Sequence, residues 1–365
     1  MQKIKIYIFS PYSSIGGDTL SLSRLIKKLD NNLYEISFIS LKKPKISNYI
    51  KQKNLKIINL KTSRSILSLA KIINVIRFDL KLNYNKYIFI SNQNFANIIS
   101  SFLKIVFGKK IKLILIERNH LDEFKYQKNF KNFFIKKLIK VAYKKADLVI
   151  GISKKLSNDL SKYINKKVVT IYNPAFDKSV YKKAKKKTIF RKKNLILSVG
   201  RFENQKDPFT MLKAFKIVND RIDCNLLMIG FGSMYKEMVD YVRLNNLQKK
   251  VIILRNVKNA FPYYKLAKIF VLHSKYEGFG NVLVEAAMFN IPIISSKCNS
   301  GPKEILGEGK YGLLFDVGNY KSLSKKIIQL LDKKKNKPSI EFKNSLKRFE
   351  INKIISKYND IFMRI

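Results

Sequence analysis

Residues that build covalent or metal-stabilised frameworks are scarce in this chain. Its 365 residues include two cysteines, two histidines and no tryptophan. Two cysteines are too few for the disulfide framework of a small secreted domain, and they suit a reducing, cytoplasmic setting. No Cys-x-x-Cys pair occurs, and two histidines cannot build a histidine-rich metal site. We therefore expect no metal and no other cofactor.

Long apolar runs are also missing. No stretch approaches the roughly 18 consecutive apolar residues that a membrane-spanning helix requires. The segment from Met1 to Phe9 has the pattern of a short strand without a small-residue cleavage site, so no signal peptide is expected. Apolar residues still make up 46% of the chain, which excludes a disordered basic protein. The length indicates two folded domains.

Acidic residues are far outnumbered by basic ones. There are 25 Asp and Glu against 74 Lys and Arg, a formal net charge of +49. This charge points to an anionic partner such as nucleic acid, a phospholipid surface or a phosphorylated substrate. However, residues 1–175 hold 35 of the basic residues and residues 176–365 hold 39. The even spread, with abundant Ile, Asn, Tyr and Phe, favours a compositional background, so we expect only local clusters to carry function.

Short apolar runs alternate with segments of helical spacing along both halves of the chain. Near-continuous apolar strands separated by helices indicate parallel sheets covered on both faces. We therefore expect an α/β fold of two doubly wound, Rossmann-like domains facing a cleft. The expected strands are Ile4–Phe9, Ile36–Leu41, Leu55–Leu60, Tyr87–Ile90, Ile111–Ile116, Leu148–Ile152, Val168–Ile171, Leu195–Val199, Leu226–Ile229, Val251–Leu254, Ile269–Leu272 and Ile291–Ser295.

The segment from Asp177 to Asn194 separates the two halves. It is polar and rich in lysine, and we interpret it as the interdomain linker. The last segment, Glu341 to Ile365, has apolar positions at helical spacing and suits one closing helix. The expected domains are residues 1–175 and 176–342, followed by the helix of residues 343–365.

Two common nucleotide-binding motifs give no candidate site in this sequence. No Asp-x-Asp occurs, so no obvious carboxylate pair is available to hold a metal–nucleotide complex. Residues 307–312 match G-x-G-x-x-G, but they neither follow an expected strand nor open a helix, because Leu313, Leu314 and Phe315 come directly after them. We interpret this segment as a turn.

The loop after the strand Leu195–Val199 carries two cations. Gly200 makes the turn, Arg201 and Lys206 follow, and Asp207-Pro208 has the pattern of a helix start. This loop lies at the carboxyl end of a strand, where open α/β sheets bind ligands. Arg201 and Lys206 therefore suit a pyrophosphate, although two solvated surface charges would show the same pattern.

A second loop follows the strand Ile269–Leu272. Its sequence from Glu277 to Glu285 contains Gly-Phe-Gly-Asn, with a helix expected to begin near Asn281. Free N–H groups at that helix start attract phosphate. Glu277 in the loop and Glu285 one turn into the helix can serve different parts of one extended ligand. The simpler alternative is that Glu277 only caps the helix.

A third glycine loop, Ser13 to Asp18, follows the first strand and gives a weaker signal. Together with the Gly-Arg-x4-Lys loop, Asn173-Pro174 and Glu277-x7-Glu285, it resembles family 4 retaining glycosyltransferases of the GT-B fold. The resemblance spans nearly the whole chain and is strongest over residues 171–315. It also implies that the C-terminal helix crosses back to the first domain.

The resemblance implies a role for each motif. Arg201 and Lys206 would hold the donor diphosphate, Glu277 the transferred sugar and Glu285 the nucleotide ribose. Gly16 and Gly17 would match the flexible glycine loop of the acceptor-side domain. We expect these two residues to contact the donor. The other expected donor-binding residues are Gly200, Gly278, Phe279, Gly280, Asn281 and Val282.

Two histidines and one further segment have weaker assignments. His120 follows a first-domain strand, and the resemblance gives it a catalytic role, while a surface or supporting role is the alternative. His273 follows a strand at a position that the family fills variably, and we interpret it as structural. The segment from Ser300 to Leu306 is similar to that of members that use UDP-sugars such as galactose or N-acetylated hexosamines.

Residues 124–145 contain eight lysines and no acidic residue. The apolar residues at spacings of three and four form one stripe on a helix, namely Phe130, Phe133, Phe134, Leu138, Val141 and Ala142. A basic amphipathic helix of this kind suits an anionic membrane surface. The alternative is a helix whose stripe faces the core of the domain.

These features predict a metal-independent, retaining glycosyltransferase. It would move a hexose or N-acetylhexosamine from a nucleotide sugar, UDP-linked, to a glycan or lipid-linked acceptor in surface polysaccharide biosynthesis. We expect it in the cytoplasm, with a peripheral position on the inner face of the cytoplasmic membrane as an option. The alternatives are a nucleotide-sugar epimerase on the same fold and a basic nucleic-acid-binding protein, for which no motif is found.

Overall fold

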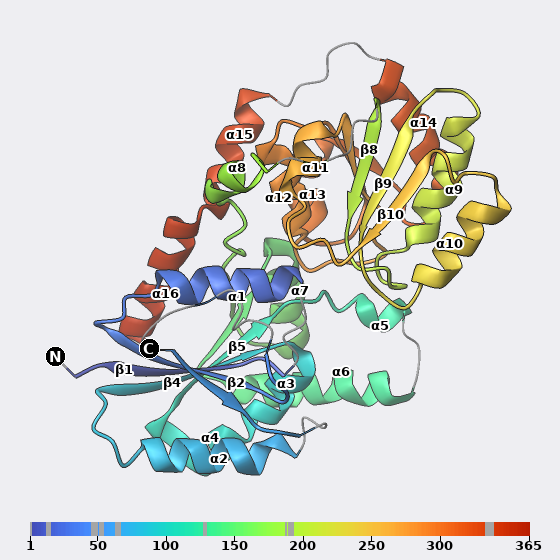
Figure 1. Ribbon diagram of the computed structural model, residues 1–365. Coiled ribbons are helices and arrows are strands. Elements are labelled where there is room, and N and C mark those ends of the chain that lie inside the picture. The colour runs from blue at the N-terminus through green and yellow to red at the C-terminus, as the bar shows by residue number, and fades with distance from the viewer. Residues whose placement is uncertain are drawn as a thin grey trace. The chain divides into compact units, whose positions relative to one another are not determined.

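Two compact units make up the chain. Unit 1 is Met1–Pro174 with Ile351–Ile365, and unit 2 is Ala175–Glu350. The computed structural model describes residues 2–11, 16–44, 50, 55–62, 67–126, 130–186, 188, 193–332 and 339–365, without the side chains of residues 125, 126, 130 and 131. Each unit is a parallel sheet with helices between its strands (Figure 1). The prediction of an α/β fold with two doubly wound domains is confirmed.

The sheet of unit 1 has seven strands in the order β3-β2-β1-β4-β5-β6-β7. All neighbouring pairs are parallel, and the central strands are buried along nearly their whole length. This burial explains their continuous apolar sequences. The strands are β1 Ile4–Phe9, β2 Tyr34–Ser40, β3 Leu55–Asn59, β4 Lys86–Asn92, β5 Lys112–Glu117, β6 Leu148–Gly151 and β7 Val168–Thr170.

Helices cover both faces of this sheet, and the last helix of the chain is one of them. It packs against the first helix and against the sheet. The rings of Tyr34 on β2 and Phe362 meet edge to face at 5.8 Å, and Lys86 Nζ on β4 donates to the Phe362 carbonyl at 3.2 Å. The helices of unit 1 are α1 Gly17–Lys28, α2 Ser68–Asp79, α3 Asn94–Ser101, α4 Leu103–Phe107, α5 Glu123–Tyr126, α6 Phe130–Ala142, α7 Lys154–Ile164 and α16 Ile351–Arg364.

The sheet of unit 2 has six parallel strands in the order β10-β9-β8-β11-β12-β13. The chain starts at β8, winds outward through β9 and β10, and then returns to the other side of β8 with β11. The direction of winding therefore reverses between β8 and β11. The strands are β8 Leu195–Val199, β9 Asn225–Gly230, β10 Val251–Arg255, β11 Ile269–Leu272, β12 Ile293–Ser296 and β13 Leu313–Phe315.

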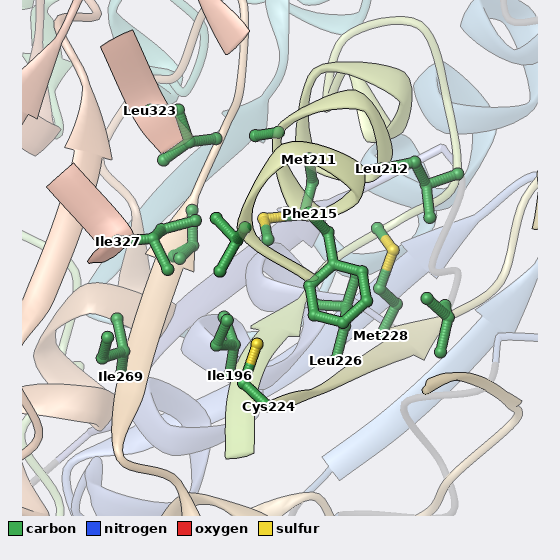
Figure 2. Packing of buried hydrophobic residues seen from close by; sticks show 14 of the residues in the cluster. Ile196, Met211, Leu212, Phe215, Cys224, Leu226, Met228, Ile269, Leu323 and Ile327 are labelled. Carbon is green, nitrogen blue, oxygen red and sulfur yellow. The ribbon is translucent and has the colours of Figure 1, made fainter. Parts of the chain in front are cut away.

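The largest apolar core of unit 2 lies between this sheet and its helices. Figure 2 shows Phe215 at the centre, between the strand residues Leu226 and Met228 and its helical neighbour Met211. The helices of unit 2 are α8 Ser179–Lys183, α9 Pro208–Asn219, α10 Tyr235–Leu244, α11 Phe261–Leu266, α12 Asn281–Met288, α13 Gly301–Ile305, α14 Tyr320–Asp332 and α15 Ile340–Leu346. None of the helices described here is long and apolar enough to cross a membrane.

Two expected segments differ from the structure. The described part of the expected linker, Asp177–Asn194, includes helix α8, which packs on unit 2: Tyr181 Oη donates to the Met288 carbonyl at 2.9 Å, and its ring meets Phe289. The expected closing helix is two helices, because Glu350 leaves the helical conformation with ψ 136°. Helix α15 belongs to unit 2 and α16 to unit 1. Apolar spacing continues across this break, so the sequence pattern alone does not reveal it.

The apolar stripe of α6 faces outward. Phe133, Phe134, Leu138 and Val141 are 54%, 49%, 51% and 62% exposed. Ile139, which lies outside the predicted stripe, is buried, and so is Ala142 at the edge of the stripe. The alternative in which the whole stripe faces the core is therefore wrong.

Candidate functional site

The predicted cations and carboxylate of unit 2 meet where the winding of its sheet reverses. The loop after β8 and the loop after β11 leave the same edge of the sheet in opposite directions, which is where open α/β sheets form ligand crevices. A small pocket lies there, lined among others by Gly200, Arg201, Lys206, His273 and Ser274. Sequence reasoning identified the first three of these residues as ligand-binding.

An ion pair joins the two loops. Lys206 Nζ contacts Glu277 Oε1, and the two side chains are only 18% and 8% exposed. Because the pair is partly shielded from water, its attraction is stronger than that of a surface pair, and losing one partner would leave a charge poorly solvated. Ser274 Oγ also donates to Glu277 Oε1 at 2.7 Å. Glu277 is therefore fixed from both loops, which a simple helix-capping role does not require.

Hydrogen bonds along the same two loops hold Arg201 at the rim of the pocket. Arg201 Nη2 donates to Gln205 Oε1 at 2.7 Å, and Gln205 Nε2 donates to the Tyr276 carbonyl at 3.1 Å. The guanidinium is exposed and keeps further N–H donors for a ligand. Sequence reasoning missed Gln205 and Ser274, because neither carries charge and nothing in their spacing marks them.

Glycines let backbone segments approach closely beside the pocket. A Cβ added to Gly230, at the end of β9, would lie 1.8 Å from the Gly200 carbonyl oxygen, and one on Gly232 would lie 2.3 Å from the Phe202 carbonyl oxygen. By contrast, a Cβ on Gly200 would meet only the Lys206 side chain at 3.8 Å. The critical glycines are therefore Gly230 and Gly232, which the sequence analysis did not select.

Helix α12 begins beside these loops at Asn281, as predicted. Gly280 precedes it with φ +97°, a left-handed conformation that favours glycine. Gly278, Gly280, Asn281 and Val282 thus form the turn and the first residues of the helix. The ring of Phe279 packs on Phe349 at 5.0 Å and is buried, so this residue can offer a ligand only its backbone.

Glu285 lies one turn into α12 and is 7% exposed. Its Oε2 accepts a hydrogen bond from Tyr264 Oη at 3.3 Å. Tyr264 is itself fully buried, stacked between Phe270 and Phe289, and burial raises the pKa of its hydroxyl well above the usual value. The phenol therefore stays protonated and can keep donating to Glu285.

Unit 1 has an equivalent reversal of winding between β1 and β4. Gly16 and Gly17 lie there, after β1 and at the start of α1, with Gly16 extended at φ −175°. Ser13, Ser14 and Ile15 of the predicted glycine loop lie outside the described residues. A Cβ on Gly16 would meet nothing within 4 Å, so the backbone there lies open.

His120 follows β5 and lies between two carboxylates. Its Nε2 is 2.9 Å from Asp159 Oδ2 and its Nδ1 is 3.2 Å from Asp122 Oδ2, and the ring is 5% exposed. Asp159 also pairs with Lys155, and these contacts hold the pKa of its carboxyl below the usual value against the effect of burial. This arrangement fixes the ring orientation, as a functional histidine requires, but an anchored supporting residue would look the same.

A buried polar cluster next to His120 was not predicted. The Glu117 carboxylate accepts from Tyr143 Oη at 2.5 Å and from the Arg118 amide at 2.9 Å, while the Arg118 guanidinium donates to Asn92 and Asn173. Burial raises the pKa of Glu117. Burial and the charge of Glu117 raise the pKa of the nearby Glu123 to about 7. Only the fold brings these residues together, from β4, β5, the residue after α6 and the segment before Pro174.

The comparison with known families agrees with this geometry. Residues 180–348, which include the pocket and helix α12, match the family "Glycosyl transferases group 1". The chain carries a group 1 glycosyltransferase domain on a GT-B fold.

Several relatives of this glycosyltransferase are known. It is 28% identical over 265 residues, covering 72% of the chain and 70% of the relative, to the N-acetylgalactosamine-N,N'-diacetylbacillosaminyl-diphospho-undecaprenol 4-alpha-N-acetylgalactosaminyltransferase of Campylobacter jejuni. It is 25% identical over 99% of both chains to the amylovoran biosynthesis glycosyltransferase AmsD of Erwinia amylovora. Among solved structures, HepE of Anabaena in complex with UDP and glucose superimposes with a TM-score of 0.81 and 15% identity, over 99% of this chain and 100% of HepE.

The close approach of Gly230 to Gly200 gives a first prediction for the glycosyltransferase. Gly230→Ala should push the loop after β8 away and lower the melting temperature. The matched control, Gly200→Ala, has room for its Cβ and should change the melting temperature little. Differential scanning fluorimetry measures both variants; equal losses of melting temperature would contradict the prediction.

The raised pKa of Glu123 gives a second prediction. The folded state favours the protonated carboxyl, so this group costs stability as the pH rises from the unfolded pKa near 4.5 through the folded value of about 7. Between pH 5 and pH 8 the wild type should lose about 2.5 kcal/mol more of its unfolding free energy than Glu123→Gln does. Urea unfolding measures this difference. Glu237→Gln, at an exposed position of α10, is the control and should follow the wild type.

Proposed function

We propose that this glycosyltransferase moves a hexose or N-acetylhexosamine from a UDP-linked sugar to a glycan or lipid-linked acceptor, with retention of configuration and without a metal ion. The observation that carries the proposal is the set of Arg201, Lys206 and Glu277 at the reversal of winding in unit 2. Two cations held by neighbouring groups at the carboxyl ends of β8 and β11 fit the diphosphate of a nucleotide sugar. Their charge can replace that of a metal ion.

The reaction follows from what these groups can stabilise. The bond between the anomeric carbon and the phosphate oxygen breaks, and negative charge grows on the leaving UDP beside Arg201 and Lys206. The acceptor hydroxyl forms the new bond on the same face of the sugar, and its proton passes to the leaving phosphate. Retention is thus compatible with a site whose carboxylate, Glu277, is already engaged by Lys206 and Ser274.

Further residues would bind the rest of the donor and the acceptor. Glu277, fixed by Lys206 and Ser274, would accept hydrogen bonds from hydroxyls of the transferred sugar. Glu285, near the start of α12, would bind the ribose. His120 and the loop of Gly16 and Gly17 lie in unit 1, which would supply the acceptor side.

The relatives support the choice of donor and acceptor. HepE has been solved with UDP and glucose, and it shares the fold over nearly the whole chain. The Campylobacter relative is named for a diphospho-undecaprenol acceptor and an N-acetylgalactosaminyl group. AmsD is named for the biosynthesis of a polysaccharide, amylovoran. The Campylobacter name fits a lipid-linked acceptor, the AmsD name fits a glycan acceptor, and the HepE complex fits a UDP-linked donor.

The donor site gives a third prediction. UDP-sugars should raise the melting temperature, because a ligand that binds only the folded state stabilises it, and GDP- and ADP-sugars should raise it less. Lys206→Ala and Glu285→Ala should each lower transfer by roughly 10²-fold or more. Transfer should continue in excess EDTA. A radiolabelled transfer assay measures these rates, and circular dichroism confirms that the variants are folded.

The controls replace exposed residues of the same types. Lys213→Ala on α9 and Glu237→Ala on α10 should leave transfer unchanged. Unchanged transfer by Lys206→Ala or Glu285→Ala would remove the donor-site assignment. If NMR shows that the protein converts a UDP-sugar into its epimer without any acceptor, the protein is instead a nucleotide-sugar epimerase.

We also propose that the glycosyltransferase works in the cytoplasm, docked on the inner face of the membrane that holds its acceptor. Helices α2, α4 and α6 follow one another across the same face of the unit 1 sheet (Figure 1). They and their flanking residues expose an unusual number of large apolar side chains, namely Phe78, Phe102, Ile105, Val106, Phe133, Phe134, Leu138 and Val141. We call this set the apolar face of unit 1.

Lysines accompany the apolar face. Lys109, Lys110, Lys137, Lys140 and Lys144 are exposed on it or beside it. The only acidic residue within α2, α3, α4 and α6 is Asp79, which is buried. Apolar side chains with surrounding lysines fit an anionic bilayer, whose attraction is about 1 kcal/mol for each nearby lysine. The exposed carboxylate of Asp147 next to α4 is paired with Lys104.

The apolar face gives a fourth prediction. Wild-type protein should float with vesicles of phosphatidylglycerol and phosphatidylethanolamine, and less so at high salt. A variant with Phe133→Ser and Phe134→Ser and with glutamine at positions 137, 140, 144 and 145 should stay in the soluble fraction.

The control variant changes the same number of charges in unit 2. Glutamine at positions 213, 216, 236 and 249, all exposed lysines, should leave flotation unchanged. Equal flotation of the unit 1 variant and the wild type would contradict membrane docking by this face.

A further inference from the structure

His273 follows β11 and is 5% exposed. Its ring bridges three segments of unit 2. Nε2 is 2.8 Å from Ser198 Oγ on β8, and Nδ1 is 2.5 Å from the backbone carbonyl oxygen of Lys206 in the loop after β8. A residue that only filled the core would not need a polar ring with both nitrogens occupied. The ring thus links the ends of β8 and β11 to the loop that carries a diphosphate-binding candidate.

The partners define the state of the ring. A carbonyl oxygen can only accept, so Nδ1 carries the proton and Nε2 accepts from the Ser198 hydroxyl. Burial lowers the pKa of His273, as does the charge of Lys206, while Asp207 and the backbone contacts act in the opposite direction. The ring is therefore neutral at neutral pH, with both of its nitrogens satisfied.

The hydrogen bond from His273 to the Lys206 carbonyl lies next to a residue with an unusual backbone conformation. Asp207, the next residue, has φ +52°, a left-handed conformation that is unfavourable for most non-glycine residues. Pro208 follows at the first helical position and has no N–H. The hydrogen bond from His273 offsets this strain and fixes the plane of the peptide between Lys206 and Asp207.

Lys206 is consequently held at both ends by the loop after β11. Its carbonyl accepts from His273 and its ammonium contacts Glu277, four residues further along that loop. Without the backbone contact, the ammonium could follow the loop away from the pocket even while Glu277 stays in place.

We propose that His273 is the positioning residue for Lys206, setting the direction of its ammonium toward the donor diphosphate. This inference rests on the proposed function of Lys206. His273 then differs from an ordinary buried histidine in one respect. Replacing His273 must change ligand binding through the position of Lys206.

Two substitutions distinguish the two ring nitrogens. An asparagine amide can place its N–H₂ near the position of Nδ1, so His273→Asn keeps a donor for the Lys206 carbonyl. Glutamine reaches instead toward the position of Nε2 and Ser198, so His273→Gln loses that donor. Calorimetric titration with UDP should show roughly tenfold weaker binding by His273→Gln and a change below about twofold for His273→Asn.

A double-mutant cycle tests the route through Lys206. Adding His273→Gln to Lys206→Met should weaken UDP binding no further, because the group that His273 positions is already absent. Urea unfolding shows that each variant is folded. Equal binding by the asparagine and glutamine variants, or an additional tenfold loss in the double variant, would overturn the inference.

The wild type provides an independent measurement. With ¹⁵N-labelled histidine, NMR should show His273 neutral and protonated at Nδ1, and the His120→Gln variant leaves one histidine to assign. A ring protonated at Nε2 would overturn the inference whatever the variants do. Failure of the wild type to bind UDP would overturn the proposed function and this inference together, whereas binding that ignores His273 would overturn the inference alone.

Discussion

The reversal of winding between β8 and β11 is the constraint on which the candidate site depends. Two neighbouring parallel strands there send their loops apart, so the edge of the sheet is left open. The ion pair of Lys206 and Glu277 joins the two loops across the opening. Gln205 and His273 add neutral hydrogen bonds between the loops, and Ser274 donates to the Glu277 carboxylate within the loop after β11. A charged ligand can enter a site that is already ordered.

Unit 1 uses the same topology with a different set of groups. Its reversal lies between β1 and β4, and the nearby cluster of Glu117, Arg118 and Tyr143 is buried rather than open. Burying such charges is costly unless each one is hydrogen-bonded, and the network around Glu117 meets that condition. Unit 2 therefore has cations at a pocket, while unit 1 has the buried His120 and Glu123, whose carboxyl has a raised pKa.

The large positive charge has two separate meanings in the structure. Most of it is spread over the surface and does not identify a partner. A small part of the charge lies at defined positions. Arg201 and Lys206 lie at a pocket, and several lysines surround the outward-facing side chains of α6. Position rather than total charge relates this protein to an anionic ligand.

The sequence by itself determined the alternation of strands and helices, the class of fold, and the start of α12 at Asn281, since these depend on local apolar periodicity and on glycine and proline. It also singled out Arg201, Lys206 and Glu277, whose side chains the structure brings together, while the role of Glu285 stays a prediction. The break at Glu350, the packing of α8, the outward face of α6 and the contacts of His273 were decided by the tertiary structure. Each of these depends on which surface a segment meets, and residues such as Ser198 and His273, 75 positions apart, are joined only by the pairing of β8 with β11.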